Sequence, residues 1–557
     1  METVPQYGRW SKEFGLERKI DRVGFVTPAG LLETRPTFVH EPVELAYDRH
    51  GYEGLLPSGR QVTAVRFTPV QPGRHRYRAL SQGKVAEEGE FVCERSDHPG
   101  YVEVSKKDPR YFALSNGAAF CPIGLNLAFP PSYPLPRGTE HFLVSEKRAT
   151  LGVREYRRWF QELARNGGNL ARIYLSWDYF SPETEVAGQL EPARFARLDA
   201  VVEAARECGV RLKLCLEHFR TFEPAAPFAK VLKHPGDGRA PRDMDEWFRA
   251  KTWQDLWMRK VHAWFARYGD DPTIMAWELW NELECCATQD WPMLREWARG
   301  MLRVMKEMAP RQLVTNTLGS LDRESQLCPY GDFHMDEMDF QQVHRYLDQG
   351  ADLGICHDDP VAFCADAIRV ARRPDRPILM SETGGVNDCH TGPFPYYRMD
   401  ARGSIFCDVT FAPFFAGSAG TGQIWHWYEY VDQKGLWPGY RPFADLVSGI
   451  QLDAEDFKVA DVSTDRAWFL CLRGDEHLLA YVRNKQDSWY AVLRDGHAPE
   501  VLTDQTFDLS PLGVRSGKPA LYRPWPEPDG EATLRGGRLR LPPFRYGFLL
   551  KIRLGSG

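Results

Sequence analysis

The sequence predicts an α/β protein in which a central (β/α)8 TIM barrel is flanked by N-terminal and C-terminal β-sandwich domains. Three observations lead to this prediction. The chain has 557 residues, more than a single hydrophobic core usually organises. Its middle alternates short apolar runs with longer amphipathic stretches, whereas both ends hold short runs of alternating apolar and polar residues. We therefore expect domains at residues 1–108, 109–455 and 456–557.

The two terminal domains are predicted from their spacing of short strands. In the first, runs such as RVGFV, QVTAVRFTPV and GEFVCER are separated at short intervals by Gly, Pro and Asp. The last hundred residues repeat this pattern with AWFLCLR, HLLAYVRN and YGFLLKI. Such spacing is typical of antiparallel β-sandwiches. No combination of residues in the N-terminal segment suggests a catalytic or binding site, so the active site is expected in the middle domain.

The middle domain contains short apolar runs that we interpret as barrel strands. They lie at 120–126, 169–177, 210–218, 273–280, 312–317, 338–346, 376–382 and 422–427. Helical patterns lie between several of them, at 154–168, 191–209 and 291–308, and the first of these ends on glycines, where a helix C-cap belongs. The stretch 318–333 has no helical pattern and is expected to be a loop. Strands alternating with helices favour the barrel.

Composition and charge exclude several classes of function. Hydrophobic residues make up 43% of the chain and charged residues 26%, as in ordinary globular proteins. A net charge of −6 gives no electrostatic reason to expect nucleic acid or an acidic membrane surface as partner. No apolar run approaches the ~18 residues of a membrane helix, and the first residues do not resemble a secretory signal. The sparse cysteines lie mostly in apolar segments, so we expect reduced thiols and a cytoplasmic protein; the oligomeric state is not indicated.

Two glutamates stand at the predicted ends of the fourth and seventh strands. Glu282 follows the apolar run TIMAW, and Glu382 follows PILM. In a barrel of this kind the carboxyl ends of the strands carry the active residues. Two facing carboxyl groups are what cleavage of a glycosidic bond requires, since one protonates the leaving oxygen while the other attacks or activates water.

Each glutamate also has a purely structural interpretation. Asn281 could cap a following helix with Glu282 in its first turn, and Glu382 could be a charge that reaches solvent at a strand end. Each structural interpretation is plausible for one glutamate alone. That both apply at two matching strand ends is much less plausible. Glu278 shares strand parity with Glu282, so it is expected to point into the barrel as a buried structural carboxylate. It is the main competitor for the acid role.

The motif WELWNE at 277–282, followed by ILMSETGG at 378–385, resembles the clan A glycoside hydrolases, particularly the family 5 cellulase and mannanase group. The start of the middle domain, LSNGAAFCPIGLNLAF, resembles their first strand. The resemblance implies a retaining β-glycoside hydrolase that needs no cofactor and acts on a carbohydrate. It implies Glu282 as acid/base, Glu382 as nucleophile and Asn281 as a hydrogen-bonding partner of the substrate 2-hydroxyl. The sugar, and the choice between exo and endo action, stay open.

The same resemblance suggests further substrate-binding residues. Arg172, in NLARIYLSW, matches the arginine near the nucleophile, and its charge would keep Glu382 ionised; the alternative is a structural ion pair. His344 and Tyr346, in QVHRY, match a His-x-Tyr motif whose tyrosine contacts the nucleophile. His218 ends the third predicted strand and is equally compatible with a substrate or a structural hydrogen bond.

Trp425 and Trp427 are the candidates for a sugar platform. An aromatic face can stack on the apolar C–H face of a pyranose. The two tryptophans share a strand face, so their parity does not distinguish them.

Two rival functions follow from other interpretations of the same residues. A metal-dependent barrel hydrolase would use His218, His344 and acidic residues as ligands, but the sequence has none of the usual His-x-His spacings, and we expect no metal. A non-catalytic carbohydrate-binding barrel would have lost its catalytic groups, whereas both glutamates are present.

Overall fold

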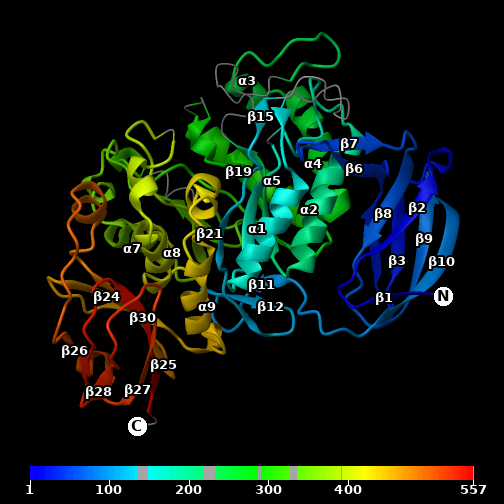
Figure 1. Cartoon of the computed structure of the whole chain (residues 1–557). Coiled ribbons are helices and arrows are strands. Elements are labelled where there is room, and N and C mark those ends of the chain that lie inside the picture. The colour runs from blue at the N-terminus through cyan, green and yellow to red at the C-terminus, as the bar shows by residue number, and fades with distance from the viewer. Residues whose placement is uncertain are drawn as a thin grey trace.

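The computed structural model describes residues 1–134, 148–176, 178–218, 232–286, 288, 290–326, 335–390 and 392–555. A β-rich N-terminal region, a central α/β region and a β-rich C-terminal region follow one another along the chain (Figure 1). The two β-rich regions lie on opposite sides of the central one. Within the described residues no helix is long and apolar enough to cross a membrane.

The N-terminal region consists of antiparallel strands joined by one parallel pair. A five-stranded sheet has the order β1-β10-β9-β3-β4, a three-stranded sheet has the order β2-β8-β5, and β6 and β7 form a separate hairpin. The strands are β1 (Glu2–Pro5), β2 (Trp10–Gly15), β3 (Arg22–Val26), β4 (Leu32–Pro36), β5 (Phe38–His40), β6 (Val43–Tyr47), β7 (Glu53–Pro57), β8 (Val62–Phe67), β9 (Gly73–Ser81) and β10 (Lys84–Glu94). One hydrophobic cluster takes side chains from both larger sheets, including Trp10 and Phe67 from one and Phe25 and Phe91 from the other.

A small sheet closes the amino-terminal side of the central strands. It consists of β11 (Val102–Val104), β12 (Phe112–Leu114) and β13 (Ala119–Phe120). Its residues Val102 and Phe112 share a hydrophobic cluster with Leu170, Leu313 and Leu379, which are the first or second residues of central strands. The domain boundary expected after residue 108 therefore passes through this sheet.

The central strands run parallel and pair in chain order. One sheet holds β14 (Gly124–Asn126), β17 (Leu170–Tyr174), β18 (Arg211–His218), β19 (Ile274–Asn281) and β20 (Leu313–Thr315). A second parallel pair consists of β21 (Gln341–His344) and β22 (Ile378–Glu382). Every residue of β18, β19 and β22 is buried, polar ones included, as expected for parallel strands that are covered on both faces. The short antiparallel pair β15 (Tyr133–Pro134) and β16 (Arg148–Ala149) lies in the connection after β14.

The eighth predicted strand, 422–427, is wrong as an extended strand. Only an isolated parallel bridge joins Ile424 to Thr383, and Trp427 already starts a π-helix that runs from Trp427 to Asp432. Even so, Asn126 donates its backbone N–H to the carbonyl of Ile424 at 3.1 Å. The segment therefore makes main-chain contacts with both β22 and β14.

Helices follow most of the central strands. They are α1 (Val153–Arg165), α2 (Phe195–Glu207), α3 (Met244–Arg249), α4 (Lys251–Tyr268), α5 (Trp291–Met308), α7 (Pro360–Ala371), α8 (Ser404–Phe415) and α9 (Arg441–Val447). As predicted, α1 ends before a glycine, Gly167, whose φ of 84° is accessible to glycine without steric cost. Asp290 caps α5 by accepting the N–H of Met293. Of the predicted loop 318–333, residues 318–326 hold one short helical turn, Glu324–Gln326, and 327–333 lie outside the described residues.

The C-terminal region again contains two sheets. Their strands are β23 (Lys458–Asp461), β24 (Ala467–Arg473), β25 (His477–Asn484), β26 (Thr506–Asp508), β27 (Gly517–Tyr522), β28 (Thr533–Arg535), β29 (Arg538–Arg540) and β30 (Gly547–Leu554). The sheet orders are β23-β24-β25-β30-β27 and β26-β29-β28. One hydrophobic cluster joins Phe469 and Phe548 of the first sheet to Phe507 and Leu539 of the second. On the side facing the central region, Arg483 forms a buried ion pair with Asp408 of α8 at 2.7 Å.

Candidate active site

Polar side chains from several parallel strands meet at the carboxyl end of the central sheet. Arg172 is the centre of this group and is fully buried. It donates to both oxygens of Glu278, at 2.7 Å from Nε and 2.5 Å from Nη2. Its Nη2 also donates to Asn281 Oδ1 at 2.7 Å, and its Nη1 donates to Glu382 Oε1. One guanidinium group therefore orients side chains from β19 and β22 together.

Glu382, the last residue of β22, is held by donors on both oxygens. Tyr174 donates its hydroxyl to Oε1 at 2.7 Å, and Tyr346 donates its hydroxyl to Oε2 at 2.7 Å. The residue is only 4% exposed. These hydrogen bonds hold the buried carboxylate in a single orientation, which is what a nucleophile requires.

Glu282 follows β19 in an unusual backbone conformation. Its φ of 54° and ψ of 56° lie in the left-handed region, which is strained for a residue with a side chain. The N–H of Glu282 is held by Thr317 Oγ1 at 3.0 Å, and its side chain caps no helix. The alternative in which Asn281 caps a helix is therefore wrong, because the Asn281 amide oxygen is bonded to Arg172.

His344 lies between the two glutamates. Its Nδ1 is 2.9 Å from Glu282 Oε1 and 3.6 Å from Glu382 Oε2, and its Nε2 is 3.0 Å from Ser381 Oγ. Burial lowers the pKa of His344 to about 4, so the ring is neutral at neutral pH. A neutral ring can donate from Nδ1 to Glu282 while its Nε2 accepts from Ser381.

The two glutamates are close enough for direct electrostatic coupling. One carboxylate oxygen of Glu282 lies within 4.8 Å of one of Glu382. Carboxyl groups about 5–5.5 Å apart are typical of retaining glycosidases, whereas inverting enzymes separate them by about 6.5–9.5 Å. The separation fits the retaining geometry.

The surroundings shift the pKa values of these glutamates in opposite directions. Burial, then the negative charges of Glu382 and Glu284, raise the pKa of Glu282 well above its usual range. Burial opposes ionisation of Glu382, but the charges of His344 (when protonated) and Arg172, with the hydroxyls of Tyr346 and Tyr174, outweigh it and lower its pKa to about 2. These opposite shifts favour the protonated form of Glu282 and the ionised form of Glu382.

Glu278 occupies the position expected of a structural carboxylate. It is fully buried, and both oxygens bond to Arg172, with a further bond from Thr317 Oγ1 at 2.8 Å. Glu278 and Asn281 both contact Arg172 although they are three residues apart, so strict alternation breaks between them. Burial by itself would raise the pKa of Glu278, but the positive charges of Arg172 and Lys213 outweigh it, so the pKa is lowered. A permanently ionised group cannot donate a proton at neutral pH.

The remaining predicted residues lie around this centre. His218 is 7% exposed and contacts Ser176 Oγ through Nδ1 at 2.9 Å. Trp425 is half-buried, with its ring centroid 5.5 Å from that of Tyr174. Trp427 is 5% exposed and packs edge-on against Trp425 and Phe129. Only Trp425 thus combines an accessible face with direct contact to a partner of Glu382.

Tyr174 and Asn126 also belong to the site. Both lie at strand ends, where active residues were expected, but the sequence analysis gave neither of them a role. Asn126 accepts from Arg172 Nη1 at 3.1 Å and donates to the carbonyl oxygens of Ser381 and Gln423, both at 3.0 Å. Tyr174 looks like one more aromatic in a buried strand. The sequence does contain one indication of its role. Tyr174 lies two residues after Arg172 in the same strand, so both side chains are expected to point to the same face.

Two groups among the described residues have the donor types of a metal site. One is Glu282, His344 and Glu382 themselves, and the other is Asp322, Asp348 and His390. His218, named for the metal-dependent alternative, is in neither group. In the first group, Glu382 already accepts from Arg172 and two tyrosines, and this cation beside it disfavours a metal ion on electrostatic grounds.

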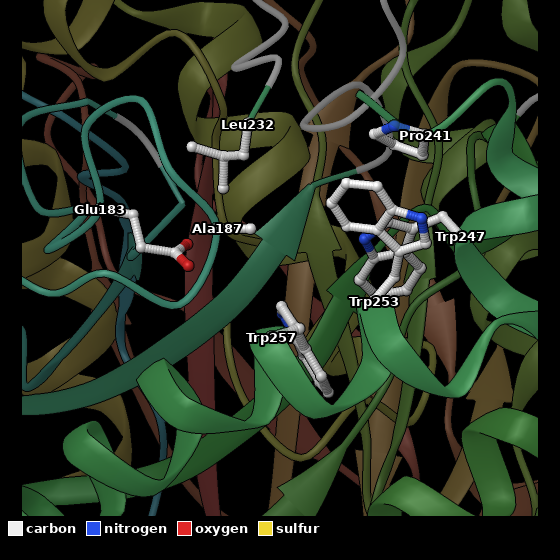
Figure 2. A pocket seen from close by; sticks show the side chains of 7 residues that line it. All are labelled: Glu183, Ala187, Leu232, Pro241, Trp247, Trp253 and Trp257. Carbon is white, nitrogen blue, oxygen red and sulfur yellow. The ribbon is translucent and has the colours of Figure 1, made fainter. Parts of the chain in front are cut away.

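A separate small cavity is lined by Glu183, Ala187, Leu232, Pro241, Trp247, Trp253 and Trp257 (Figure 2). Its volume of about 10 Å³ leaves room for one water at most, so it cannot hold a sugar. Trp257 donates to Glu217 at 2.8 Å, and Lys260 pairs with both Glu217 and Glu183. This buried network supports the end of β18, next to His218.

Sequence comparisons relate the chain to known glycosidases. The family described as Cellulase (glycosyl hydrolase family 5) matches residues 138–398. Mannan endo-1,4-beta-mannosidase 4 from Oryza sativa subsp. japonica is 30% identical over 361 residues, which are 59% of this chain and 74% of the relative. Mannan endo-1,4-beta-mannosidase 3 from the same plant is 29% identical over 255 residues, 40% of this chain and 54% of the relative.

Structural comparison agrees at the level of the fold. A glycoside hydrolase family 5 structure from Bacteroides vulgatus superposes with a TM-score of 0.51 at 12% identity, covering 82% of this chain and 94% of that one. The family and this likeness imply a (β/α)8 barrel for the central region.

Proposed function

Because this chain belongs to glycosyl hydrolase family 5, we propose that Glu382 is the nucleophile and Glu282 the acid/base of its retaining glycosidase reaction. The observation that carries the assignment is the pair itself. The two carboxylates lie within 4.8 Å of each other, with pKa values driven in opposite directions by their surroundings. Retention needs this combination of one ionised and one protonated carboxyl group.

In the first step, an oxygen of Glu382 attacks the anomeric carbon. The bond from that carbon to the leaving oxygen breaks, and its electron pair goes to the leaving oxygen, which takes the proton of Glu282. Arg172, Tyr174 and Tyr346 hold the attacking carboxylate in place, so little reorganisation accompanies the attack.

In the second step, Glu282 acts as a base. It takes a proton from water, whose oxygen attacks the anomeric carbon, and the bond to Glu382 breaks to restore that carboxylate. The contact of His344 Nδ1 with Glu282 Oε1 at 2.9 Å would hold Glu282 in one orientation in both steps. Asn281, fixed by Arg172, is proposed to bond the substrate 2-hydroxyl, with Trp425 as the sugar platform and His218 at the edge of the site.

For the substrate, we propose a β-1,4-linked mannan. Support comes from the names of the rice relatives, which are mannan endo-1,4-beta-mannosidases. The same names support endo action, in which the enzyme cuts within a chain.

For the architecture, we propose a closed barrel between two β-sandwiches. The main-chain contacts of Ile424 with Thr383 and Asn126 support closure, and a hydrophobic cluster shared between two sheets in each terminal region supports the sandwiches. The expected boundary between residues 455 and 456 is kept. The first boundary, expected after residue 108, is moved to before Val102, so that the small sheet β11–β13 is counted with the barrel it covers. Cytoplasmic localisation stays a proposal, supported by free cysteines throughout the described residues.

The substrate proposal is tested by comparing polysaccharides of one linkage and different sugars. The wild-type protein is incubated with β-1,4-mannan, β-1,4-glucan and β-1,4-xylan, and new reducing ends are counted. Faster release from mannan, with internal cuts that shorten the chains early, is the expected result. Hydrolysis of glucan or xylan, but not of mannan, would contradict the proposed substrate. The proposed site would be contradicted if Glu282→Gln and Glu382→Gln both kept the wild-type activity.

A further inference from the structure

A hairpin of the N-terminal region reaches the catalytic end of the central region. It is formed by β6 and β7, joined by the turn Asp48–Tyr52, and in Figure 1 these strands lie beside the upper part of the central region, near β15. At its tip, the ring of Tyr52 lies 5.6 Å from the ring of Tyr133 in β15. The hairpin belongs to neither larger sheet of its own region.

The hairpin is anchored firmly to the central region. Glu53, fully buried, accepts from Arg197 Nε at 2.8 Å, from the N–H of Val153 at 2.7 Å and from the Tyr179 hydroxyl at 3.0 Å. A Cβ at Gly152 would lie 2.2 Å from the Glu53 carboxylate, so this approach depends on a glycine there. The neighbouring residue, Tyr52, is thus held in place before any ligand arrives.

Aromatic side chains connect this tip with the proposed sugar platform. Two segments, 129–133 and 425–428, supply them. At one end, Phe129 lies 6.5 Å from Trp425 and 5.1 Å from Trp427. At the other, the hydroxyls of Tyr133 and Tyr428 are 3.1 Å apart, and Tyr133 contacts Tyr52. We call Trp425, Phe129, Tyr428, Tyr133 and Tyr52 the aromatic row.

The members of the aromatic row are only partly buried. All five have intermediate exposure, in contrast to Trp427, which is 5% exposed. Part of each of these side chains is therefore left accessible, although Phe129, Trp425 and Tyr428 also pack against the central hydrophobic core. A run of accessible aromatic faces that starts at the catalytic residues fits a ligand with successive apolar faces, and a chain of β-linked pyranoses is such a ligand.

We propose that the β6–β7 hairpin completes the substrate-binding surface, with Tyr52 forming, together with Tyr133 and Tyr428, a distal sugar-binding subsite. The inference rests on the proposed function, because it needs a substrate that extends over several sugars. It gives the N-terminal region a part in substrate binding.

The test compares a long and a short substrate of the same sugar series. Values of kcat/KM are measured for a β-1,4-linked mannohexaose and a mannotriose with the wild type and with Tyr52→Ala. We expect the hexaose-to-triose ratio to fall by about tenfold in the variant, the effect of losing one well-placed aromatic contact. Tyr52→Phe, which keeps the ring, should retain the wild-type ratio.

Two further variants separate binding from packing. Tyr52→Leu keeps an apolar contact for Tyr133 but has no aromatic face, so it should also lower the ratio while its thermal unfolding midpoint stays near that of the wild type. Tyr7→Ala removes a partly buried tyrosine of the same region that packs against Tyr101, near the amino ends of the central strands, and should leave the ratio unchanged.

The outcomes distinguish this inference from the proposed function. An unchanged ratio in both Tyr52→Ala and Tyr52→Leu, with an active wild type, would overturn the subsite alone. A wild type inactive on mannose oligosaccharides would overturn the mannan proposal, and the ratio would then be measured on the cello- or xylo-oligosaccharides that it cleaves. Inactivity on every series would contradict both.

Discussion

A carboxylate oxygen of Glu282 lies within 4.8 Å of one of Glu382, so each of these glutamates is part of the electrostatic surroundings of the other. The negative charge of Glu382 helps to raise the pKa of Glu282, after burial itself. The ionised nucleophile thereby keeps the proton on the acid that the first step needs.

This coupling predicts the pH profile and its response to one substitution. The rate should fall at high pH as Glu282 loses its proton and at low pH as Glu382, with a pKa of about 2, gains one. In Glu382→Gln the neighbouring charge is absent, so the pKa of Glu282 should fall. Titration of the Glu282 carboxyl by NMR in both proteins measures this directly, and an unchanged or higher pKa in the variant would show that the groups are not coupled.

Removal of the acid should depend on the leaving group. Glu282→Ala is expected to lower turnover of substrates with poor leaving groups by about 10²–10⁴-fold, and much less for aryl glycosides that leave without protonation. A series of aryl glycosides of graded phenol acidity gives the comparison. If Glu278→Gln produced this dependence and Glu282→Ala did not, the acid would be Glu278.

The two tyrosine hydroxyls on Glu382 should act on the acidic limb of the pH profile. Tyr174→Phe and Tyr346→Phe each remove one hydrogen bond to the ionised carboxylate at 2.7 Å, so the pKa of Glu382 should rise in each. The acidic limb then moves to higher pH, which a kcat/KM profile measures. A Tyr174→Phe variant with lowered but measurable activity and an unmoved acidic limb would mean that the hydroxyl does not act through Glu382.

Arg172 should be essential for stability as well as for activity. Arg172→Met takes from the buried Glu278 the guanidinium that bonds both of its oxygens and leaves only the more distant Lys213, which should lower the free energy of unfolding by about 3–5 kcal/mol. Urea unfolding of this variant and of the double variant Arg172→Met/Glu278→Gln provides the test. The double variant should recover part of the loss, and no recovery would mean that the uncompensated charge is not the cause.

The two candidate platform tryptophans should behave differently. Trp425→Ala is expected to weaken substrate binding while the protein stays folded, because this ring is half-buried. Trp427→Ala should lower the free energy of unfolding by about 3–5 kcal/mol, because its ring is packed against Phe129 and Trp425. Substrate titration and urea unfolding of both variants separate the two roles, and equal effects in both assays would contradict the distinction.

Much of the central fold could be predicted because its strands are covered on both faces. Segments such as 210–218 and 273–280 are short and mainly apolar, and the polar residues at or just after their carboxyl ends include His218 and Glu282. The segment 422–427 has the same appearance but forms only an isolated bridge, since a π-helix begins at Trp427. Residue pattern alone does not reveal where a strand gives way to a helix with such rare hydrogen bonding.

The parts of the site that could not be predicted depend on contacts between distant segments. Tyr174 looks like a core aromatic until Glu382 is placed beside it. The left-handed backbone of Glu282 has no sequence signal, because glycine is the residue expected there. Tyr52 lies in a turn of the N-terminal region, and only the anchoring of Glu53 brings it to the catalytic end.

The central claim, that Glu382 is the nucleophile, is tested most directly by trapping the covalent intermediate. An activated 2-deoxy-2-fluoro glycoside slows the second step, so the sugar should stay attached, and mass spectrometry of proteolytic peptides then identifies the modified residue. We predict one added sugar on the peptide of the wild type that contains Glu382. In the Glu382→Gln variant no sugar should be attached to this peptide. Attachment to Glu278 or Glu282 instead would contradict the assignment.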